Sequence, residues 1–357
     1  MMTKIIDGIF NVGVNGNNAY LIASEKNVLI DTVSKAQSDE LIENIEKILP
    51  VTKLDYIVCN HTEPNKSGAV KKLLQLNPKV EIIGTIAAMR NLKEITNTSF
   101  SEHIAKEGAT LEIGGFTLKF CIVPNLNWPD TMVTYETTNK ILFSCDIFSR
   151  ENGGTLQEYY DKYFMPYKGF VKKAIEKLSE FSIELICTGS GALIENVYKA
   201  FSHYKEWSRE DIAENAVILF ASKYGSTSYM AEIIRDTLTE NGLETVCYDV
   251  YSTDADIIIK AANQAKAVIV GTPTINRNAD KKVWNILTSL DAVNIRNKPC
   301  FVFGSYGWGG DGMDLIQKLM LQLKMRPFDK PFGSLFALSD EKKTELVKYT
   351  KHFFKIT

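Results

Sequence analysis

Short apolar runs recur along the whole chain, and most of them end at a turn rich in glycine, asparagine or serine. In the first part of the chain these runs are close-set: residues 8–13, 18–22 and 27–32 follow one another through tight turns. This spacing predicts strands that pair antiparallel. Residues 36–48 differ, because their apolar positions recur at helical spacing. The predicted helix carries on one face Leu41, Ile42, Ile45 and Ile48.

From residue 54 onward, strand-like and helix-like patterns alternate. This alternation is typical of the α/β class. Buried strands are expected at 54–59, 80–84, 117–123, 132–136, 141–144 and 184–187. After a turn over 60–68, helices are expected at about 68–76, 85–92 and 168–180, and at 196–215, where a helix gives way to a charged linker.

Three further apolar runs near the C-terminal end each lead into a turn of small and polar residues. They cover residues 216–220, 268–272 and 300–304. Continuous apolar runs of this kind are typical of parallel strands that are buried on both faces. The carboxyl ends of parallel strands meet at one edge of the sheet, where ligands bind. We therefore expect the three turns to lie close together.

The length of 357 residues predicts two domains of about 150 residues or more each. We place them at 1–210 and 211–357. Apolar residues make up 45% of the chain and charged residues 24%, as in ordinary globular proteins. The net charge of −2 gives no reason to expect nucleic acid or an anionic membrane as a partner. No apolar run is long enough to span a bilayer, and the N-terminal residues lack the apolar core of a signal peptide.

The six cysteines are far apart in the sequence, and none of them forms a Cys-x-x-Cys pair. This spacing excludes a zinc ribbon, a rubredoxin-type knot and an iron–sulfur signature. Several of the cysteines lie within apolar strands. We therefore expect buried, reduced thiols and a cytoplasmic location for the protein.

A hydroxyl-rich turn follows the strand at 216–220 and leads into a helix. Its glycine lets the backbone approach a ligand, and the helix behind it directs amide groups and its positive dipole end at the same place. The turn has neither the Walker pattern nor Gly-x-Gly-x-x-Gly. The alternative is an ordinary β–α turn of small residues. We expect this turn to bind a phosphate monoester through Ser222, Tyr224, Gly225, Ser226 and Thr227.

The other two turns offer backbone amides and aromatic rings that suit a flat ring system with polar edges. The second turn contains Pro273, Thr274, Ile275 and Asn276, and the third contains Ser305, Tyr306, Gly307, Trp308 and Gly309. The three turns together resemble the FMN site of a flavodoxin, over about residues 214–357. This resemblance implies FMN as the cofactor. FAD is not expected, because no second nucleotide-binding fingerprint is present to hold an adenylate.

The first half resembles the metallo-β-lactamase fold, and the whole chain resembles the flavodiiron proteins, also called A-type flavoproteins. The resemblance implies an α/β architecture: a metallo-β-lactamase-like αββα sandwich followed by a flavodoxin-like, doubly wound parallel sheet. The segments that carry it are 18–22, 29–33, 61–64, 127–130, 142–146, 159–160, 274–276 and 305–308.

In the family that the chain resembles, seven residues hold two irons. This chain retains three of them, His61, Glu63 and Asp146. The four other positions are replaced, by Asn65, Lys66, Asn127 and Ser190. Asparagine is a weak neutral donor, and an ammonium group has no lone pair to give to a cation.

The replacements also make sense as a change of charge. Without iron, three carboxylates that face one cavity would repel each other. Asn65 removes one negative charge from this set, and Lys66 adds a positive one. We therefore expect iron to be absent and His61 and Glu63 to be hydrogen-bonded vestiges of the ligand set. We also expect the Lys66 ammonium to lie within ion-pair distance of Glu63 or Asp146.

The resemblance implies an FMN-dependent electron-transfer flavoprotein or oxidoreductase whose diiron centre is absent or incomplete. One alternative is an active O₂ or NO reductase, which needs iron. Others are a flavin-bearing subunit that pairs with an intact paralogue, and a hydrolase with one metal on the three retained residues. The resemblance further implies a head-to-tail homodimer. Electrons are expected from a separate redox protein, because the chain contains no NAD(P)H fingerprint and no rubredoxin module.

Overall fold

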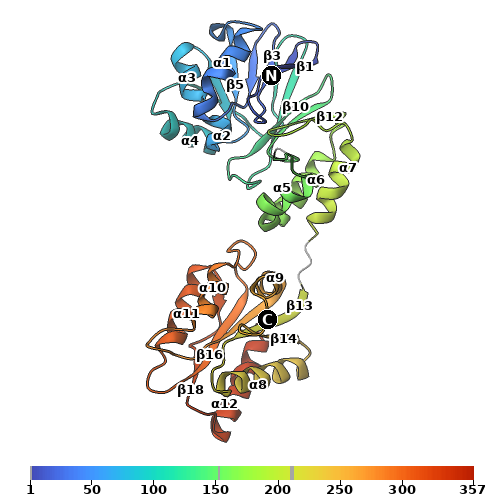
Figure 1. The fold of residues 1–357 in the computed structure, drawn as a ribbon. Coiled ribbons are helices and arrows are strands. Elements are labelled where there is room, and N and C mark those ends of the chain that lie inside the picture. Colours follow the sequence, from blue (N-terminus) through green and yellow to red (C-terminus); the bar gives the residue numbers. More distant parts are fainter. Residues whose placement is uncertain (1, 152, 210–212) are drawn as a thin grey trace. The chain divides into compact units, whose positions relative to one another are not determined.

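The computed structural model describes residues 2–151, 153–209 and 213–357 (Figure 1). Contacts divide the chain into two compact units, Met1–Glu210 (unit 1) and Asp211–Thr357 (unit 2). The domain boundary that we expected between residues 210 and 211 lies outside the described residues. None of the helices in the described ranges is long and apolar enough to cross a membrane.

The first sheet of unit 1 has seven strands that follow the order of the sequence. β1 to β4 pair antiparallel, as predicted for residues 8–33. β4 to β7 pair in parallel. The strands are β1 (Thr3–Ile6), β2 (Ile9–Asn11), β3 (Tyr20–Ile22), β4 (Val28–Ile30), β5 (Tyr56–Val58), β6 (Glu81–Gly84) and β7 (Ser101–Ile104).

The second sheet of unit 1 has five strands in the order β12-β11-β10-β9-β8. β8 to β11 pair antiparallel, and β12 pairs with β11 in parallel. The carboxyl ends of β11 and β12 therefore lie side by side. The strands are β8 (Thr110–Glu112), β9 (Thr117–Ile122), β10 (Met132–Glu136), β11 (Ile141–Cys145) and β12 (Leu185–Thr188).

Helices cover the outer face of each sheet of unit 1 (Figure 1). Apolar residues of α1, α3 and α4 share a buried cluster with the first sheet, and those of α5, α6 and α7 share one with the second. The helices are α1 (Ser38–Glu46), α2 (Pro64–Ser67), α3 (Val70–Leu76), α4 (Ile86–Thr96), α5 (Leu156–Tyr163), α6 (Lys168–Leu178) and α7 (Val197–Trp207). Short 3₁₀ turns η1 (Lys35–Gln37), η2 (Val51–Lys53) and η3 (Met165–Tyr167) complete the set.

A third apolar cluster lies between the two sheets of unit 1. The rings of Tyr20 from the first sheet and Phe143 from the second are 5.2 Å apart. The Tyr20 hydroxyl also donates to the Thr188 carbonyl oxygen at 2.7 Å. Two sheets that pack face to face, each with helices outside, form the αββα sandwich that the sequence predicts.

Unit 2 contains one parallel sheet in the order β14-β13-β15-β16-β17, with β18 also paired to β16. Every pairing in it is parallel. The strands are β13 (Ala213–Phe220), β14 (Glu244–Asp249), β15 (Ala265–Gly271), β16 (Pro299–Tyr306), β17 (Arg326–Pro327) and β18 (Phe332–Leu335).

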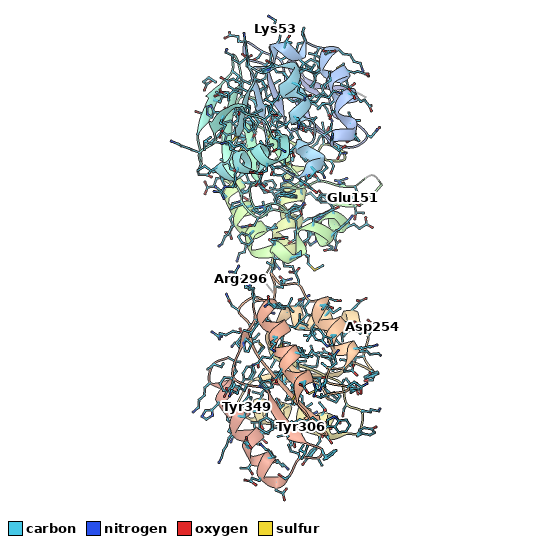
Figure 2. The ribbon with its side chains drawn as sticks, turned by 90° about the vertical axis from the view of Figure 1, so that its left-hand side faces the viewer. Lys53, Glu151, Asp254, Arg296, Tyr306 and Tyr349 are labelled. Carbon is cyan, nitrogen blue, oxygen red and sulfur yellow. The ribbon has the colours of Figure 1, made fainter. Side chains whose placement is uncertain are left out.

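Both faces of the unit 2 sheet are covered by helices (Figure 1). Alternate residues of each strand point to opposite faces, so Val217 joins the cluster under α9, α10 and α11. Its neighbour Ile218 joins the cluster under α8 and α12. Tyr349 of α12 is labelled in Figure 2. Its ring packs edge-on against that of Phe301, with the ring centroids 5.2 Å apart. This is the doubly wound sheet that we expected, with α8 (Ser226–Glu240), α9 (Ala255–Gln264), α10 (Lys281–Thr288), α11 (Asp311–Gln322) and α12 (Asp340–Phe354).

The structure differs from the sequence-based prediction in two places near the predicted sites. We predicted that the strand ends at Gly304, yet β16 continues through Ser305 and Tyr306, which pair with β18. The sequence does not reveal this extension, because the partner strand lies far along the chain. The second difference is α2, a short helix that forms inside the turn predicted at 60–68.

All six cysteines are free, and all except Cys247 are buried. Burial raises the pKa of the thiols, for example that of Cys121 to about 11. The thiols are therefore neutral near pH 7, as expected of structural cysteines that pack like small apolar residues.

We predict that the same substitution, tyrosine to phenylalanine, changes the free energy of unfolding differently at two neighbouring tyrosines of unit 1. The buried Tyr204 hydroxyl accepts a hydrogen bond of 3.0 Å from the Phe148 amide. Tyr204→Phe leaves that buried amide without a partner and should lower the free energy of unfolding by about 1–3 kcal/mol. The buried Tyr160 hydroxyl has no partner among the described residues, so Tyr160→Phe should be neutral or slightly stabilising. Calorimetry of the full chain measures both, and an equal loss in the two variants would contradict this reading.

Candidate functional site

The strand order of unit 2 reverses at β13, which lies between β14 and β15. In an open parallel sheet, the crevice outside the carboxyl ends at such a reversal is the usual place for a ligand. Phe220 of β13 pairs with Gly271 of β15, and Gly271 also pairs with Phe303 of β16. The three loops predicted to bind FMN therefore leave adjacent strands at one edge of the sheet.

The loop after β13 is open where a phosphate would approach. Gly225 has a φ angle of 86°, and no atom lies within 4 Å of the Cβ that another residue would add. α8 begins at the next residue, Ser226, so its first amides are not used inside the helix. The Ser228 amide donates to the Ser222 hydroxyl at 3.1 Å. No acceptor for the amides of Ser226 and Thr227 is found among the described residues, and both amides are available to an anion.

Hydrogen bonds hold the second loop to the third. The Thr274 amide donates to the Ser305 carbonyl oxygen at 3.2 Å, and the Gly312 amide donates to Thr274 Oγ1 at 3.3 Å. The tip of the second loop is a two-residue turn at Asn276 and Arg277, whose φ angles of 50° and 60° are both positive. Asparagine is among the residues that adopt this conformation most readily, so the turn gives the loop a fixed shape.

The phosphate turn contacts the third strand as well, because Thr227 Oγ1 lies 3.3 Å from Ser305 Oγ. The first and third loops each contain one large exposed aromatic side chain: Tyr224 is 85% exposed and Trp308 is 92% exposed. Large exposed rings at the ligand edge of a sheet are the surface that a flat cofactor would cover. The other predicted FMN residues lie in the same two loops or at their ends: Pro273, Ile275, Tyr306, Gly307 and Gly309.

These features fit FMN. A helix N-terminus with free amides, hydroxyl groups and a glycine without neighbours suits a phosphate monoester. The exposed aromatic rings and the backbone of the other two loops suit an isoalloxazine ring. The structure brings together all three groups of residues that the sequence analysis assigned to this cofactor.

A second group of predicted residues meets in unit 1, at the ends of three strands. His61 and Glu63 follow β5, Asp146 follows β11, and Ser190 follows β12. Asn127 comes from the loop between β9 and β10. The chain therefore builds one pocket from segments that are far apart in the sequence, although only three of these residues are strong metal ligands.

The donor atoms of the retained residues face one another inside this pocket. His61 Nε2 lies 3.5 Å from Asp146 Oδ2 and 3.8 Å from Glu63 Oε2. These distances are too long for hydrogen bonds. Both nitrogens of His61 and both carboxylate oxygens of Asp146 are buried without a hydrogen-bond partner among the described residues. Our expectation that His61 and Glu63 form hydrogen-bonded vestiges is not met at His61.

The Lys66 side chain is directed into the same pocket. It is only 1% exposed; its ammonium donates to the Gly189 carbonyl oxygen and lies 3.9 Å from Asp146 Oδ1. This is the position that the sequence analysis expected for it. The short helix α2 determines the direction of the Lys66 side chain. It is a single turn that begins at Pro64, and Lys66 is buried near its end.

The charges in the pocket shift the pKa values of its carboxyl groups in opposite directions. Burial, together with repulsion from Asp146, raises the pKa of Glu63 to about 7. Burial also acts to raise the pKa of Asp146, but the nearby His61 and Lys66 outweigh it and hold that pKa below its ordinary value. Asp146 is therefore the more acidic of the two carboxyl groups.

The three other replaced positions offer little to a metal. The Asn127 side-chain amide lies 3.5 Å from Glu63 Oε2, and the side-chain oxygen of Asn65 is buried without a partner among the described residues. The Ser190 amide donates to the Ser149 hydroxyl at 3.1 Å. With the Lys66 ammonium buried beside Asp146, this set does not fit a centre of two irons, because a cation already occupies part of the pocket.

Sequence reasoning missed two residues of this pocket. Asp31 is 3% exposed and accepts hydrogen bonds from the Asn60 amide at 2.8 Å and from its side chain at 2.9 Å. The ligand atoms of Cys145, His61 and Asp146 all lie within 4.8 Å of one another. Asp31 and Cys145 both lie in segments that carry the family resemblance, 29–33 and 142–146. Their position in these segments could have indicated that they lie near the pocket.

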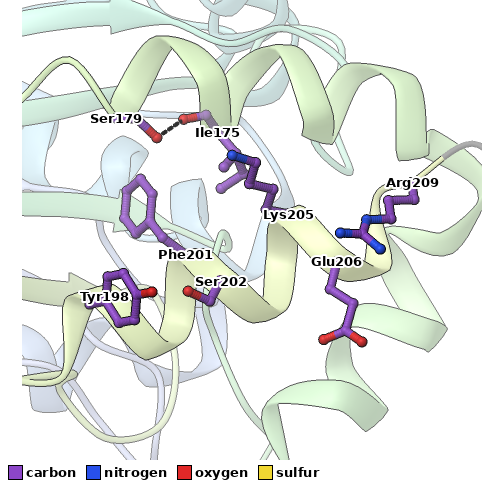
Figure 3. Close-up of a pocket in the computed structure, with 8 residues that line it drawn as sticks. All are labelled: Ile175, Ser179, Tyr198, Phe201, Ser202, Lys205, Glu206 and Arg209. Carbon is purple, nitrogen blue, oxygen red and sulfur yellow. Dashed lines mark hydrogen bonds between the residues drawn. The ribbon is translucent and has the colours of Figure 1, made fainter.

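Two surface cavities of unit 1 lie apart from these sites. One, of about 510 Å³, opens between α6 and α7 (Figure 3) and is lined by Ile175, Ser179, Tyr198, Phe201, Ser202, Lys205, Glu206 and Arg209. The other, of about 400 Å³, lies near the starts of α5 and α7 and includes Arg150 and His203. Neither cavity contains a residue predicted for FMN or for a metal.

The sequence matches two family models: "ODP family beta lactamase" over residues 15–191 and "Flavodoxin" over residues 218–348. Flavo-diiron protein FprA2 of Clostridium acetobutylicum is 33% identical over 397 residues, which covers 99% of this chain and 98% of that protein. The nitric oxide reductase of Moorella thermoacetica is 29% identical and covers 88% of this chain and 84% of its own length. Among solved structures, rubredoxin oxygen:oxidoreductase from Desulfovibrio gigas superposes with a TM-score of 0.66 at 25% identity, over 100% and 98% of the two chains.

The phosphate turn gives a direct test of the FMN site. Ser226→Ala removes a hydroxyl at the helix start, and the loss of a hydrogen bond to a charged group should weaken FMN binding about 10-fold or more. Ser252→Ala is the control, because its hydroxyl donates to the Asp249 carbonyl oxygen within the turn after β14, at the same edge of the sheet. Fluorescence titration of flavin-free protein measures both affinities. Equal affinities in the two variants would remove the turn from the phosphate site.

Proposed function

The chain belongs to the flavodiiron protein family, and on that premise we propose that it is an FMN-dependent electron-transfer flavoprotein with an incomplete diiron centre. The observation that carries the proposal is the contrast between the two units. The ligand edge of unit 2 offers free helix N-terminal amides, hydroxyl groups and exposed aromatic rings that suit FMN. The pocket of unit 1, in contrast, contains the buried Lys66 ammonium at a position where the resemblance implies a metal ligand. The flavin is therefore the redox centre that this sequence supports.

The residues of unit 2 bind and orient the cofactor. The amides of Ser226 and Thr227 and the neighbouring hydroxyls hold the phosphate. The second and third loops, which hydrogen bonds join at Thr274 and Ser305, hold the ring. When bound, FMN accepts and passes on one or two electrons, which is chemistry that belongs to the cofactor itself. The protein fixes its position and controls its contact with water.

Reduction of NO and reduction of O₂ are rival functions that relatives suggest, whereas the residues of the unit 1 pocket do not favour them. A nitric oxide reductase and a rubredoxin oxygen:oxidoreductase are similar to this chain, and each name describes a reductase of a small gas. Such an activity in this chain would need metal ligands that Asn65, Lys66 and Ser190 do not supply. A flavin-bearing subunit that works with an intact paralogue needs no such ligands and remains the second candidate.

The electron donor is expected to be a separate redox protein, since the sequence given shows neither an NAD(P)H-binding fingerprint nor a rubredoxin motif. A cytoplasmic location agrees with the six free thiols and is part of this proposal.

We predict that purified protein releases FMN rather than FAD, and that its bound flavin is reduced and reoxidised reversibly. Iron analysis should give fewer than two irons per chain, because four of the seven family ligands are replaced. Chromatography of the released flavin, a visible spectrum with and without reductant, and elemental analysis measure these quantities. Released FAD would refute the cofactor assignment, and two irons with rapid consumption of O₂ or NO would establish the reductase instead.

We also predict a homodimer arranged head to tail. Such a dimer would cover the exposed ring of Trp308 and the Asn276 turn with a partner surface, which would explain why these side chains are left open. Sedimentation at micromolar concentration measures the mass directly. A monomer under these conditions would contradict the proposal, without affecting the assignment of FMN.

A further inference from the structure

The second surface cavity of unit 1, of about 400 Å³, lies beside the starts of α5 and α7. Two segments line it: the loop that leads into α5, and the loop that leads into α7 together with the first turns of that helix. We call it the Arg150 cavity. None of the residues that line it was assigned to the flavin or to the pocket around His61, so it is a candidate site of its own.

Positive charge predominates in the lining of the Arg150 cavity. Arg150 belongs to the α5 side, whereas Lys199 and His203 belong to α7. Among the described lining residues, Glu195 is the only acidic one. No ion pair joins Arg150, Lys199 or Glu195 to another side chain within the described ranges. The arginine and the lysine are charged at neutral pH, so the cavity has an excess of positive charge.

The start of the Arg150 side chain is held by the backbone around it, but its Nε atom lacks an acceptor. The Arg150 amide donates to the Ser190 carbonyl oxygen at 3.2 Å. Gly191, with a φ angle of 81°, lies so close that an added Cβ would be 3.1 Å from the Arg150 Cβ. The Nε atom is buried and has no hydrogen-bond partner in the part of the chain that the structure describes. A buried donor of a charged group is costly when it is unpaired, so this atom points to a ligand with an oxygen acceptor.

The starts of both helices add to the positive potential of the cavity. α5 begins after its N-cap Thr155, and α7 begins after its N-cap Asn196. Both cap residues line the cavity, so the positive ends of two helix dipoles lie beside it. The nearby carboxylates on the α5 side already have partners. Glu158 accepts from the Thr155 amide at 2.6 Å, and Glu151 pairs with Lys162 at 2.5 Å.

Apolar side chains also line the cavity. Leu156 is 9% exposed, Ile194 is 6% exposed, and Leu193 is half-buried. An inorganic ion would leave this apolar wall uncovered, whereas the carbon groups of a larger ligand would remove it from water. The volume of about 400 Å³ falls in the range of pockets that bind small molecules. The lining therefore suits a ligand with an anionic head and an apolar body.

We propose that the Arg150 cavity binds a small phosphate monoester that carries an apolar group. The phosphate pairs with Arg150 and Lys199, and the carbon body covers Leu156 and Leu193. A phosphate monoester has a charge of about −1.5 to −2 at neutral pH and three acceptor oxygens, which suits two cations that come from different segments. The planar donor fork of arginine matches phosphate oxygens in particular. This site is separate from the flavin, and the inference goes beyond the flavin function.

Calorimetric titration of the full-length protein with phenyl phosphate tests this inference. The protein is first saturated with FMN and freed of the excess, so that the proposed phosphate turn of unit 2 is filled and the signal reports on another site. One binding site per chain is expected. Inorganic phosphate, the second probe, should bind about 10-fold more weakly, because it has no apolar group to cover the wall. Equal affinities for the two probes would overturn the assignment of the apolar body.

Four single variants locate the site. Arg150→Gln should weaken phenyl phosphate binding about 10-fold or more, because it removes the charge and the donor fork. Lys199→Gln should weaken it about 3-fold, as expected for a more exposed charge. Glu195→Gln should strengthen it, because it removes a carboxylate that repels the phosphate. Lys205→Gln is the matched control: this exposed lysine of the same helix lines the other cavity, and its loss should leave the affinity unchanged.

Thermal unfolding and the FMN content of each variant separate a lost site from a lost fold. Lys199 and Glu195 are both exposed, so their variants test the site even where Arg150→Gln fails to fold. No binding of phenyl phosphate to the wild-type chain would overturn the inference. Unchanged affinity in both Lys199→Gln and Glu195→Gln, or an equal loss in Lys205→Gln, would overturn it as well. The FMN content of the same samples reports separately on the flavin proposal.

Discussion

The Lys66 side chain carries a positive charge into the interior of unit 1, and the surrounding pocket depends on how that charge is balanced. Removing an ammonium group from water is costly unless it is paired and hydrogen-bonded. The Gly189 carbonyl oxygen and Asp146 Oδ1 provide those contacts. Burial acts to raise the pKa of Asp146, and His61 together with the Lys66 ammonium lowers it below its ordinary value. The charge also decides the chemistry of the pocket, because a fixed cation beside Asp146 is incompatible with two metal ions in the same space.

The ligand edge of unit 2, where we propose that FMN binds, depends on a different constraint. This constraint is the geometry of a parallel sheet. Parallel strands bring the β–α loops to one edge, and the reversal of strand order at β13 marks the point on that edge where ligands usually bind. The loops are then held by few contacts: Thr227 with Ser305, and Thr274 with the backbone on either side of the third loop. The function proposed for this unit therefore depends on loops that the sheet positions, and their exposed rings suit a planar ligand.

Much of this architecture could be predicted from the sequence, because its periodicity is strong. The helix around Leu41 and Ile45, the antiparallel strands at the start and the buried parallel strands of unit 2 all agree with the pattern of apolar residues. The strand through Ser305 and Tyr306 was missed, because its pairing with β18 is a contact between distant segments. For the pocket, residue types predicted that Lys66 would turn inward. They could not predict that His61 would be left without hydrogen bonds, since that depends on distances of a few tenths of an ångström.

The loops of the pocket are held by contacts that do not involve its metal-binding atoms, and this separation explains how the ligand set could change while the fold persisted. The Thr32 amide and hydroxyl both donate to the Lys66 carbonyl oxygen, at 2.8 Å and 2.6 Å. The Asn18 side chain donates to the Thr188 carbonyl oxygen at 2.9 Å and so fixes the start of the Ser190 turn. The backbone carbonyl oxygens of Lys66 and Thr188 accept these bonds, so the contacts do not depend on which side chains stand at positions 66 and 190. Side-chain substitutions at these two positions therefore change the charge balance of the pocket without removing these hydrogen bonds.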